Sequence, residues 1–397
     1  MKKRLLITSV VAGLVAAVGV PLAVMALPTG PSCTVDDSGG ADYLTIQAAV
    51  SDPVCSTIKV FAGNYTENVI ISRSLTLKGA KAGVSVVGRI LPSAAESNVT
   101  SSGDSQVFDV RAMNVTIDGF AVSNPGHGLG ILVKTAGNGT VIKNNIVEGI
   151  GGSSYSPNTV GIYLERGPDN VKIEKNRISN IQSGPSAQGI LVGDSTSTDP
   201  AENVRIINNE IKNISSTKGA YGIIVNNGAT SASSPNTSYA TVSILGNAIH
   251  DLTGGWDTAI GLEGSTPRAI VKNNTISNLL GVTPAKVAVH FEDNPFFFLA
   301  NVSRNSLDVG SAAAGIYVDP ALTSTYVGLK ATGTCNWWGK ADGPQGIPPA
   351  VASGTGSLVS LGVDFNPWLK SSDLSGKCGN DDHHDDNDHH VDHENDN

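Results

Sequence analysis

The side chains best suited to chemistry in this chain are acidic, aromatic and imidazole groups that follow a repeated apolar phrase. Phrases such as Gly189-Ile190-Leu191-Val192 recur, and polar or aromatic residues stand two and four positions after the glycine or alanine. Aromatic side chains suit sugar faces, and grouped carboxylates suit calcium binding or acid–base catalysis. The candidate ligand-binding residues at these places are Tyr163, Glu165, Glu263, His290, Glu292, Tyr317 and Asp319.

Strand alternation predicts which of these side chains share a face. If the apolar residue after each glycine or alanine points inward, its neighbour points outward. The outer column is then Leu132, Tyr163, Leu191, Ile224, Gly261, His290 and Tyr317. Two residues further lies a second column of Lys134, Glu165, Gly193, Asn226, Glu263, Glu292 and Asp319. This predicts that His290 lies beside Glu263, Glu292, Asp319 and Tyr317, with calcium as a possible ligand; the alternative is an ordinary solvated sheet face.

A second repeated phrase, apolar-x-apolar-x-x-Asn-x-apolar, predicts the architecture that positions these residues. Its copies are 26 to 38 residues apart, and repeats of this length indicate a stacked array. β-Branched residues two apart favour strands, and Gly, Ser, Asn and Pro between them favour turns. The asparagine place is occupied by Asp118, Asn144, Asn176, Asn209, Asn247, Asn274, Asn305 and Asn336.

The fold predicted from this repeat is all-β: a right-handed parallel β-helix, in which each coil contributes two or three short strands. One coil is too small to bury its own apolar face, so stacking must build the core. The asparagine column is expected to form a ladder, each amide bonding to the next coil about 4.8 Å away. The alternative is that these asparagines are ordinary turn formers.

The chain divides by composition into five segments. Lys2-Lys3-Arg4 and the apolar run from Leu5 to Ala26 predict a secretory signal cleaved after Ala26, with an uncleaved membrane anchor as the alternative. Both place the body outside the cytoplasm, at the cell surface or in the extracellular space. The expected segments are a signal at 1–26, an N-terminal cap with a short helix at 27–57, the β-helix at 58–344, a C-terminal cap at 345–378 and a disordered tail at 379–397.

The four cysteines suggest two disulfides, because the count is even and the chain is expected to be exported. Pairing by proximity predicts Cys33–Cys55 and Cys335–Cys378, one at each end of the stack. No Cys-x-x-Cys spacing indicates a metal or redox site.

Charge is concentrated in the tail. The net charge is −9, and residues 381–397 hold eight acidic groups; without them 26 basic residues face 27 acidic ones. The body therefore lacks the basic surface expected of a nucleic-acid-binding protein. Clustered imidazoles and carboxylates in the tail predict weak binding of Zn²⁺, Ni²⁺ or Cu²⁺. The candidate metal ligands are His383, His384, His389, His390 and His393.

Three stretches resemble known β-helix proteins. Residues 58–69, from Ile58 to Val69, resemble the opening coils of pectin-lyase-like proteins, pectin methylesterases among them. Cys335-Asn336-Trp337-Trp338-Gly339 resembles a phrase that ends many bacterial right-handed β-helix repeat surface proteins, and Val363–Leu369 looks like their closing segment. The resemblance covers nearly the whole mature chain and implies the fold, which hosts lyases, hydrolases, esterases and non-enzymes.

The catalytic motifs of the pectin-acting members are incomplete in this chain. We find no paired-aspartate motifs of pectin methylesterases, and Gly126-His127-Gly128, which resembles a polygalacturonase phrase, stands alone. The sequence therefore favours a protein that binds a polysaccharide or cell-surface glycan, or serves as a surface scaffold or adhesive stalk. A polysaccharide lyase or glycoside hydrolase acting on an acidic polysaccharide is the alternative, so enzymatic activity stays open.

Overall fold

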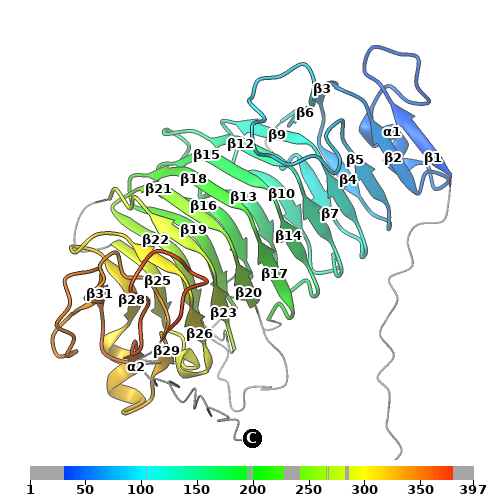
Figure 1. Ribbon diagram of the computed structural model, residues 1–397. Helices are drawn as coiled ribbons and strands as arrows, with labels where there is room; N and C mark the ends of the chain where they lie inside the picture. The colour runs from blue at the N-terminus through cyan, green and yellow to red at the C-terminus, as the bar shows by residue number, and fades with distance from the viewer. Residues whose placement is uncertain are drawn as a thin grey trace, which may run out of the picture.

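The polypeptide winds into a right-handed parallel β-helix, as predicted (Figure 1). The structure is a computed structural model that describes residues 31–378 except 104, 195, 197–199, 228–241, 265, 267 and 282–285. The expected signal at 1–26 and the expected tail at 379–397, with its five histidines, lie outside the described residues. Within the described part of the chain the strands form three parallel sheets, one strand of each sheet per coil in the middle of the stack.

The first sheet holds the strands that lead into the asparagine corner. It contains, in spatial order, β1 (Ser32–Val35), β2 (Thr57–Val60), β5 (Thr76–Lys78), β8 (Thr116–Asp118), β11 (Val141–Lys143), β14 (Lys172–Glu174), β17 (Val204–Ile207), β20 (Val242–Leu245), β23 (Ile270–Lys272), β26 (Asn301–Ser303), β29 (Ala331–Thr332) and β32 (Val363–Asp364).

The second sheet carries the candidate site. Its strands are β4 (Val69–Ile71), β7 (Phe108–Val110), β10 (Leu129–Val133), β13 (Thr159–Leu164), β16 (Ser186–Val192), β19 (Gly219–Asn226), β22 (Trp256–Glu263), β25 (Lys286–Glu292), β28 (Ala314–Val318), β31 (Leu358–Val359) and β30 (Gln345–Gly346).

The third sheet follows the asparagine corner. Its strands are β3 (Gly63–Thr66), β6 (Ser97–Thr100), β9 (Ala121–Pro125), β12 (Ile146–Gly151), β15 (Arg177–Ser183), β18 (Glu210–Ser216), β21 (Ala248–Thr253), β24 (Thr275–Ser277) and β27 (Ser306–Asp308).

Identical apolar side chains stack along the axis and form the core. Ile162 pairs with Ile190, and Ile190 with Ile223, and all three are completely buried. Each such side chain contributes about 1.5–3 kcal/mol relative to an exposed one. The in-register stacking explains why the apolar phrase repeats: a coil buries its inward residues only against the coils on either side.

The asparagine ladder is present from the coil of β11 onward. The Oδ1 of Asn209 accepts hydrogen bonds from the backbone N–H and the Nδ2 of Asn176, both at 3.0 Å. The Nδ2 of Asn209 also donates to the carbonyl oxygen of Ile173 at 2.9 Å. The same contacts link Asn145, Asn176, Asn209, Asn247, Asn274, Asn305 and Asn336 in order. These buried side chains satisfy backbone groups at a tight corner, so the ladder is structural.

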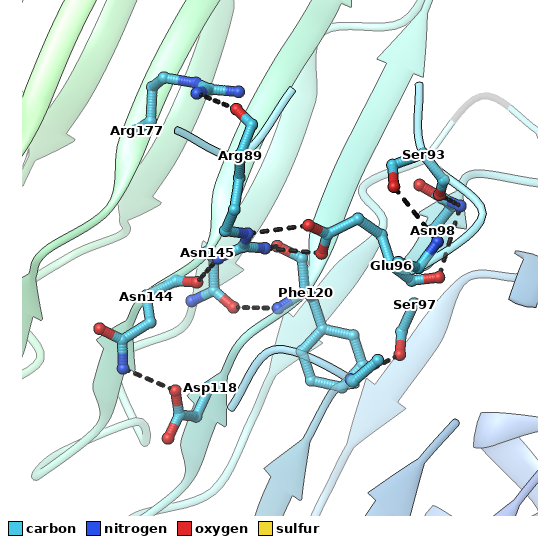
Figure 2. Close-up of polar contacts among 12 residues, drawn as sticks. Arg89, Ser93, Glu96, Ser97, Asn98, Asp118, Phe120, Asn144, Asn145 and Arg177 are labelled. Atoms are coloured by element: carbon cyan, nitrogen blue, oxygen red, sulfur yellow. Dashed lines mark hydrogen bonds and ion pairs between the residues drawn. The ribbon is translucent and has the colours of Figure 1, made fainter. Parts of the chain in front are cut away.

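Two members of the predicted column were wrong. Asn145, and not Asn144, bonds to Asn176. Asn144 adopts a φ of 54°, and its Nδ2 donates to Asp118 Oδ1 at 2.8 Å (Figure 2). The repeated phrase fits both adjacent asparagines equally well, and only pairing with the neighbouring strand distinguishes the two frames. In the preceding coil Phe120 takes the ladder place, and its backbone N–H donates to Asn145 Oδ1 at 2.9 Å.

A buried ion pair closes the N-terminal end of the ladder (Figure 2). Arg89 lies in the segment between β5 and β6 and binds both oxygens of Glu96, at 2.8 and 2.7 Å. Its Nη1 donates to the carbonyl oxygen of Asn144 at 2.6 Å, and its own carbonyl oxygen accepts from Arg177 Nη1 at 2.6 Å. The two charged side chains are 7% and 2% exposed, so they stabilise the fold only as a pair.

Short helices and disulfides lie towards both ends of the stack. Helix α1 (Ile46–Ser51) begins after Thr45, whose Oγ1 accepts from the Ala48 N–H at 3.2 Å, and packs against β1, β2 and β4. The 3-10 helix η1 (Phe297–Leu299) and helix α2 (Pro320–Thr325) lie near the C-terminal end. Both predicted disulfides, Cys33–Cys55 and Cys335–Cys378, are present, each with a Cα–Cα distance of 5.4 Å. Of the helices described, none has the length and apolarity needed to cross a membrane.

Candidate functional site

The second sheet places the predicted outer column on one line. Strand pairing sets Leu132 opposite Tyr163, and His290 opposite Gly261 and Tyr317. Glu263 lies opposite Glu292, and Asp319 follows Val318, the partner of Phe291. The inward neighbours, such as Val289 and Ile316, are fully buried. The alternation used to assign the two columns is therefore the one that the structure has.

The face also carries a column that simple alternation misses. The strands bend where a column of glycine and alanine lies: at Gly161, Gly189 and Gly222 a Cβ would lie 2.7, 2.6 and 2.5 Å from a carbonyl oxygen of the next coil. Across this bend, residues three apart face the same side. The outer face, which carries Ile224, Gly261 and His290, therefore also carries the residues three positions before them: Tyr221, Thr258 and Val287. A strict two-residue alternation does not predict these three residues on the outer face.

A pocket of about 500 Å³ lies on this face at the C-terminal end of the sheet. Strands β19, β22, β25 and β28 form its floor, and the segment that carries β30 and β31 supplies Ile347 and Leu358. Its lining residues are Tyr221, Trp256, Thr258, Val287, His290, Glu292, Ala312, Ala314, Tyr317, Asp319, Ile347 and Leu358. We refer to it as the aromatic pocket. Trp256 is 63% exposed although it is the largest apolar side chain there.

His290 is held between two carboxylates in this pocket. Its Nε2 lies 2.9 Å from Asp319 Oδ1, and its Nδ1 lies 3.8 Å from Glu292 Oε2. The ring of Tyr317 lies beside it, with centroids 5.5 Å apart and an angle of 52° between the planes. The His290 side chain is 18% exposed, so its orientation is fixed while part of the ring still meets solvent.

Glu263 lies next to the pocket in an environment that disfavours its charge. Burial and the neighbouring negative charge of Glu292 raise the pKa of Glu263 to about 7, although a hydrogen bond from Asn226 Nδ2 at 2.7 Å and the proximity of His290 oppose the rise. Burial, with the charges of Glu263 and Glu292, also raises the pKa of Tyr221 to about 12. The carboxyl groups of Glu263 and Glu292 therefore both influence the ionisation of the side chains around them.

The other two predicted site residues lie further along the same sheet. Tyr163 lines a separate pocket of about 400 Å³ with neutral polar neighbours that include Gln106, Asn158 and Gln188. Burial raises the pKa of Tyr163 to about 12. Glu165 is paired with Lys134 at 2.7 Å, as the second column allows. Tyr163 is separated from His290 by the strands that carry Leu191, Ile224 and Gly261, so the two do not share one pocket.

Two aromatic residues that line the aromatic pocket, Tyr221 and Trp256, were not predicted. Tyr221 was missed because of the bend in the strand. Trp256 stands at the start of β22, in a stretch that reads as a turn because Gly254 and Gly255 precede it. A large aromatic residue at an otherwise polar turn was the signal available in the sequence.

The structure identifies no metal centre at the predicted calcium site. Among the described residues, no three His, Cys, Asp or Glu side chains form a group that could hold a metal ion. Calcium at this face stays a prediction. The transition-metal site expected at His383–His393 lies outside the described residues and also stays a prediction.

Comparisons with known proteins agree with the architecture. Residues 58–238 match the family model for a right-handed beta helix region. No curated protein matches this chain in sequence.

Several solved structures are similar in fold. One is the rice weevil pectin methyl esterase, with 15% sequence identity, a TM-score of 0.42 and a match that covers 65% of this chain and 80% of that chain. Another is a pectin methylesterase in complex with hexasaccharide VII, with 12% identity, a TM-score of 0.42 and a match that covers 75% of this chain and 95% of that chain. The tailspike gp49 from Acinetobacter baumannii bacteriophage Fri1, a capsular polysaccharide depolymerase, is also similar, with 14% sequence identity and a TM-score of 0.38. The match covers 70% of this chain and 52% of that chain. At identities this low, the function of this chain must be inferred from its own residues.

Proposed function

We propose that this β-helix protein binds carbohydrate in the aromatic pocket. The observation that supports this most directly is the combination of Tyr221, Trp256 and Tyr317 with the polar side chains of His290, Glu292 and Asp319 in one open pocket. Sugar rings present an apolar face of C–H groups and a rim of hydroxyls, and an aromatic wall with a few fixed polar groups is complementary to both.

The exposure of Trp256 supports a binding role for this face. A large aromatic side chain that is mostly in solvent contributes little to folding, whereas at a binding surface it supplies rigid contact area. The hydrogen bond between His290 and Asp319 fixes the imidazole before a ligand arrives, which lowers the entropy lost on binding. A smooth outer face would have favoured a purely structural stalk, but this face carries two pockets.

We also propose that the protein acts outside the cytoplasm. Two disulfides within a body of this size are typical of exported proteins, and the predicted signal at 1–26 agrees with them. A glycan of the cell surface or the surrounding medium is then the accessible partner.

The test is a panel of neutral, acidic and amine-bearing polysaccharides, titrated with the full mature chain. Replacing Trp256 by alanine should weaken binding about fivefold, since a stacked aromatic contact is worth about 1 kcal/mol. His290→Ala should weaken binding as well, while the fold is retained. Leu44→Ala, which changes an exposed side chain near the opposite end, is the control and should bind like wild type. A panel without any binder, or equal binding by all four proteins, would refute the proposal.

A polysaccharide lyase or hydrolase is the second candidate, and Glu263 favours it. A carboxyl group with a pKa near 7 beside a second carboxylate is the arrangement in which one group protonates a leaving oxygen while the other acts as base or nucleophile. Assays for new reducing ends and for unsaturated ends, with and without calcium, test this. Turnover that Glu292→Gln or His290→Ala abolishes would establish it, and the absence of product from every polymer excludes it.

A further inference from the structure

The aromatic pocket has an unbalanced charge. Glu292 and Asp319 are both part of its lining, and among the described residues that line it none is Lys or Arg. Glu263 lies directly opposite Glu292 on the neighbouring strand. His290 is the one basic side chain of the lining, and it already contacts both lining carboxylates.

Elsewhere in the second column of the sheet, which contains Glu292 and Asp319, an acidic side chain is neutralised by a lysine. Further towards the N-terminus, Glu165 is paired with Lys134 at 2.7 Å on the adjacent coil. Glu292 and Asp319 instead lie on adjacent coils, about 4.8 Å apart, with the carboxyl group of Glu263 on the coil before them. Like charges on adjacent strands destabilise a sheet, and a cation placed among them removes that cost.

The aromatic side chains of the pocket are complementary to the same kind of group. An ammonium near the face of Trp or Tyr gains about 0.5–2 kcal/mol from the ring quadrupole. Tyr221, Trp256 and Tyr317 line the same pocket as Glu292 and Asp319, so one bound group can meet ring faces and negative charge together. A uronate carboxylate would instead be repelled by Glu292 and Asp319.

We propose that the glycan bound by this pocket carries protonated amines, as in polymers of amino sugars that lack N-acetyl groups. The proposal rests on the glycan-binding function proposed above and specifies the class of ligand for the same pocket. In it the ammonium of one sugar lies against Glu292 and Asp319, and the ring of that sugar stacks on Trp256 or Tyr317. This differs from the acidic polysaccharide expected from sequence for an enzyme at this face.

The experiment compares three oligosaccharides of equal length by calorimetric titration at about pH 6: glucosamine, N-acetylglucosamine and galacturonate oligomers. We expect the glucosamine oligomer to bind at least about tenfold more tightly than its N-acetylated counterpart, and the galacturonate oligomer most weakly. Raising the salt from about 50 to about 200 mM should weaken only the glucosamine complex several-fold.

Charge-neutral variants test the residues. Glu292→Gln and Asp319→Asn should each reduce glucosamine binding about three- to tenfold and reduce N-acetylglucosamine binding by a smaller factor, so that the preference for the amine-bearing oligomer narrows. Glu174→Gln removes a carboxylate from the first sheet, where Glu174 is paired with Lys172, and serves as the matched control.

The outcomes separate the two proposals. Equal or tighter binding of the neutral or acidic oligomer, lost in Trp256→Ala, overturns the amine assignment and keeps the glycan function. Glucosamine binding that Glu292→Gln and Asp319→Asn leave intact, or reduce no more than Glu174→Gln does, also overturns it. If none of the three oligomers binds and the wider panel is blank, the glycan function itself fails.

Discussion

At the scale of single residues, Glu263 lies in an environment that destabilises its ionised form. Its carboxyl group is largely buried, faces Glu292 and is partly compensated by Asn226. A side chain that loses its charge so readily contributes little to the fold in its ionised form. Burial and the charge of Glu292 raise its pKa to about 7, so its protonation changes near neutral pH.

This position predicts a pH-dependent stability. The unfolded chain releases the Glu263 proton near 4.5, whereas the folded protein keeps it until about 7, so the folded state binds more protons between these values and its stability falls as pH rises through that window. Glu263→Gln keeps a side chain that can accept from Asn226 and removes this loss. Relative to wild type, the variant should therefore gain stability across the window, by up to about 3 kcal/mol above pH 7.

Urea unfolding of both proteins at several pH values between about 4 and 8 measures this difference. The figure is an upper value, because part of the side chain meets solvent. A constant difference between the two proteins across the whole range would show that Glu263 titrates normally.

The residue positions that the sequence allowed us to predict are those set by strict alternation. His290, Tyr317, Glu292 and Asp319 lie together because each stands one or three residues after a buried β-branched residue, Val289 or Ile316. Tyr221 lay beyond prediction because the column of small residues bends the strand and breaks the two-residue period. Trp256 depends on a turn whose path is set by packing of neighbouring coils, which a single sequence does not encode locally.

At the scale of elements, the ladder determines the register of the stack. Each asparagine side chain uses its Oδ1 and its Nδ2 in bonds with neighbouring coils, so coils that slipped by one residue would leave buried amides unpaired. The repeat predicted this corner for Asn176 and the later members. The repeat placed Asn144 in the ladder instead of Asn145, because the two asparagines are adjacent in sequence. The pairing of Ile142 with Ile173 aligns Asn145, and not Asn144, with Asn176.

Removing one mid-stack member should be costly. Asn209→Ala leaves the backbone N–H and the Nδ2 of Asn176 and the carbonyl oxygen of Ile173 without their partner in the buried corner. We expect a loss of roughly 1–3 kcal/mol in the free energy of unfolding. Chemical denaturation measures it, with Arg205→Ala, an exposed residue of the same coil, as the control. A loss no larger than that of the control would mean that water or relaxation replaces the ladder bonds.

At the scale of the whole molecule, the solenoid offers a long face, and the C-terminal segment converts one end of it into a pocket. That segment passes through β30, β31 and β32, and the Cys335–Cys378 disulfide joins it to the residue next to Asn336, the last member of the asparagine ladder. Ile347 and Leu358 of this segment form a wall of the aromatic pocket. The repeat predicts the β-helix, but it does not predict that Ile347 and Leu358 form a pocket wall, because the C-terminal segment contains no copy of the repeat.

Because Ile347 and Leu358 lie between Cys335 and Cys378, we expect the Cys335–Cys378 disulfide to affect glycan binding and the Cys33–Cys55 disulfide not to affect it. Replacing both Cys335 and Cys378 by serine should lower stability by about 2–4 kcal/mol and weaken glycan binding several-fold, since the segment that holds Ile347 and Leu358 is released. The matched control replaces Cys33 and Cys55, at the far end of the stack, and should lower stability without changing affinity. Thermal melts measure the stability of both double variants, and titrations measure their glycan affinity. Equal affinities in the two variants would show that the C-terminal segment does not contribute to binding.

The tail supports a separate prediction from composition alone. Deleting residues 379–397 should abolish retention of the protein on immobilised Ni²⁺, because the deletion removes His383, His384, His389, His390 and His393. Melting temperature and glycan binding should stay as in the full chain. A large drop in melting temperature would show that these residues pack against the body.

Glycan binding in the aromatic pocket is best tested by a crystal structure of the protein with the tightest-binding oligosaccharide of the panel. We expect ordered sugar rings in the aromatic pocket, with one ring stacked on Trp256 or Tyr317 and polar contacts to His290, Glu292 or Asp319. Ordered oligosaccharide bound elsewhere on the protein, with the aromatic pocket free of it, would refute the proposed binding site.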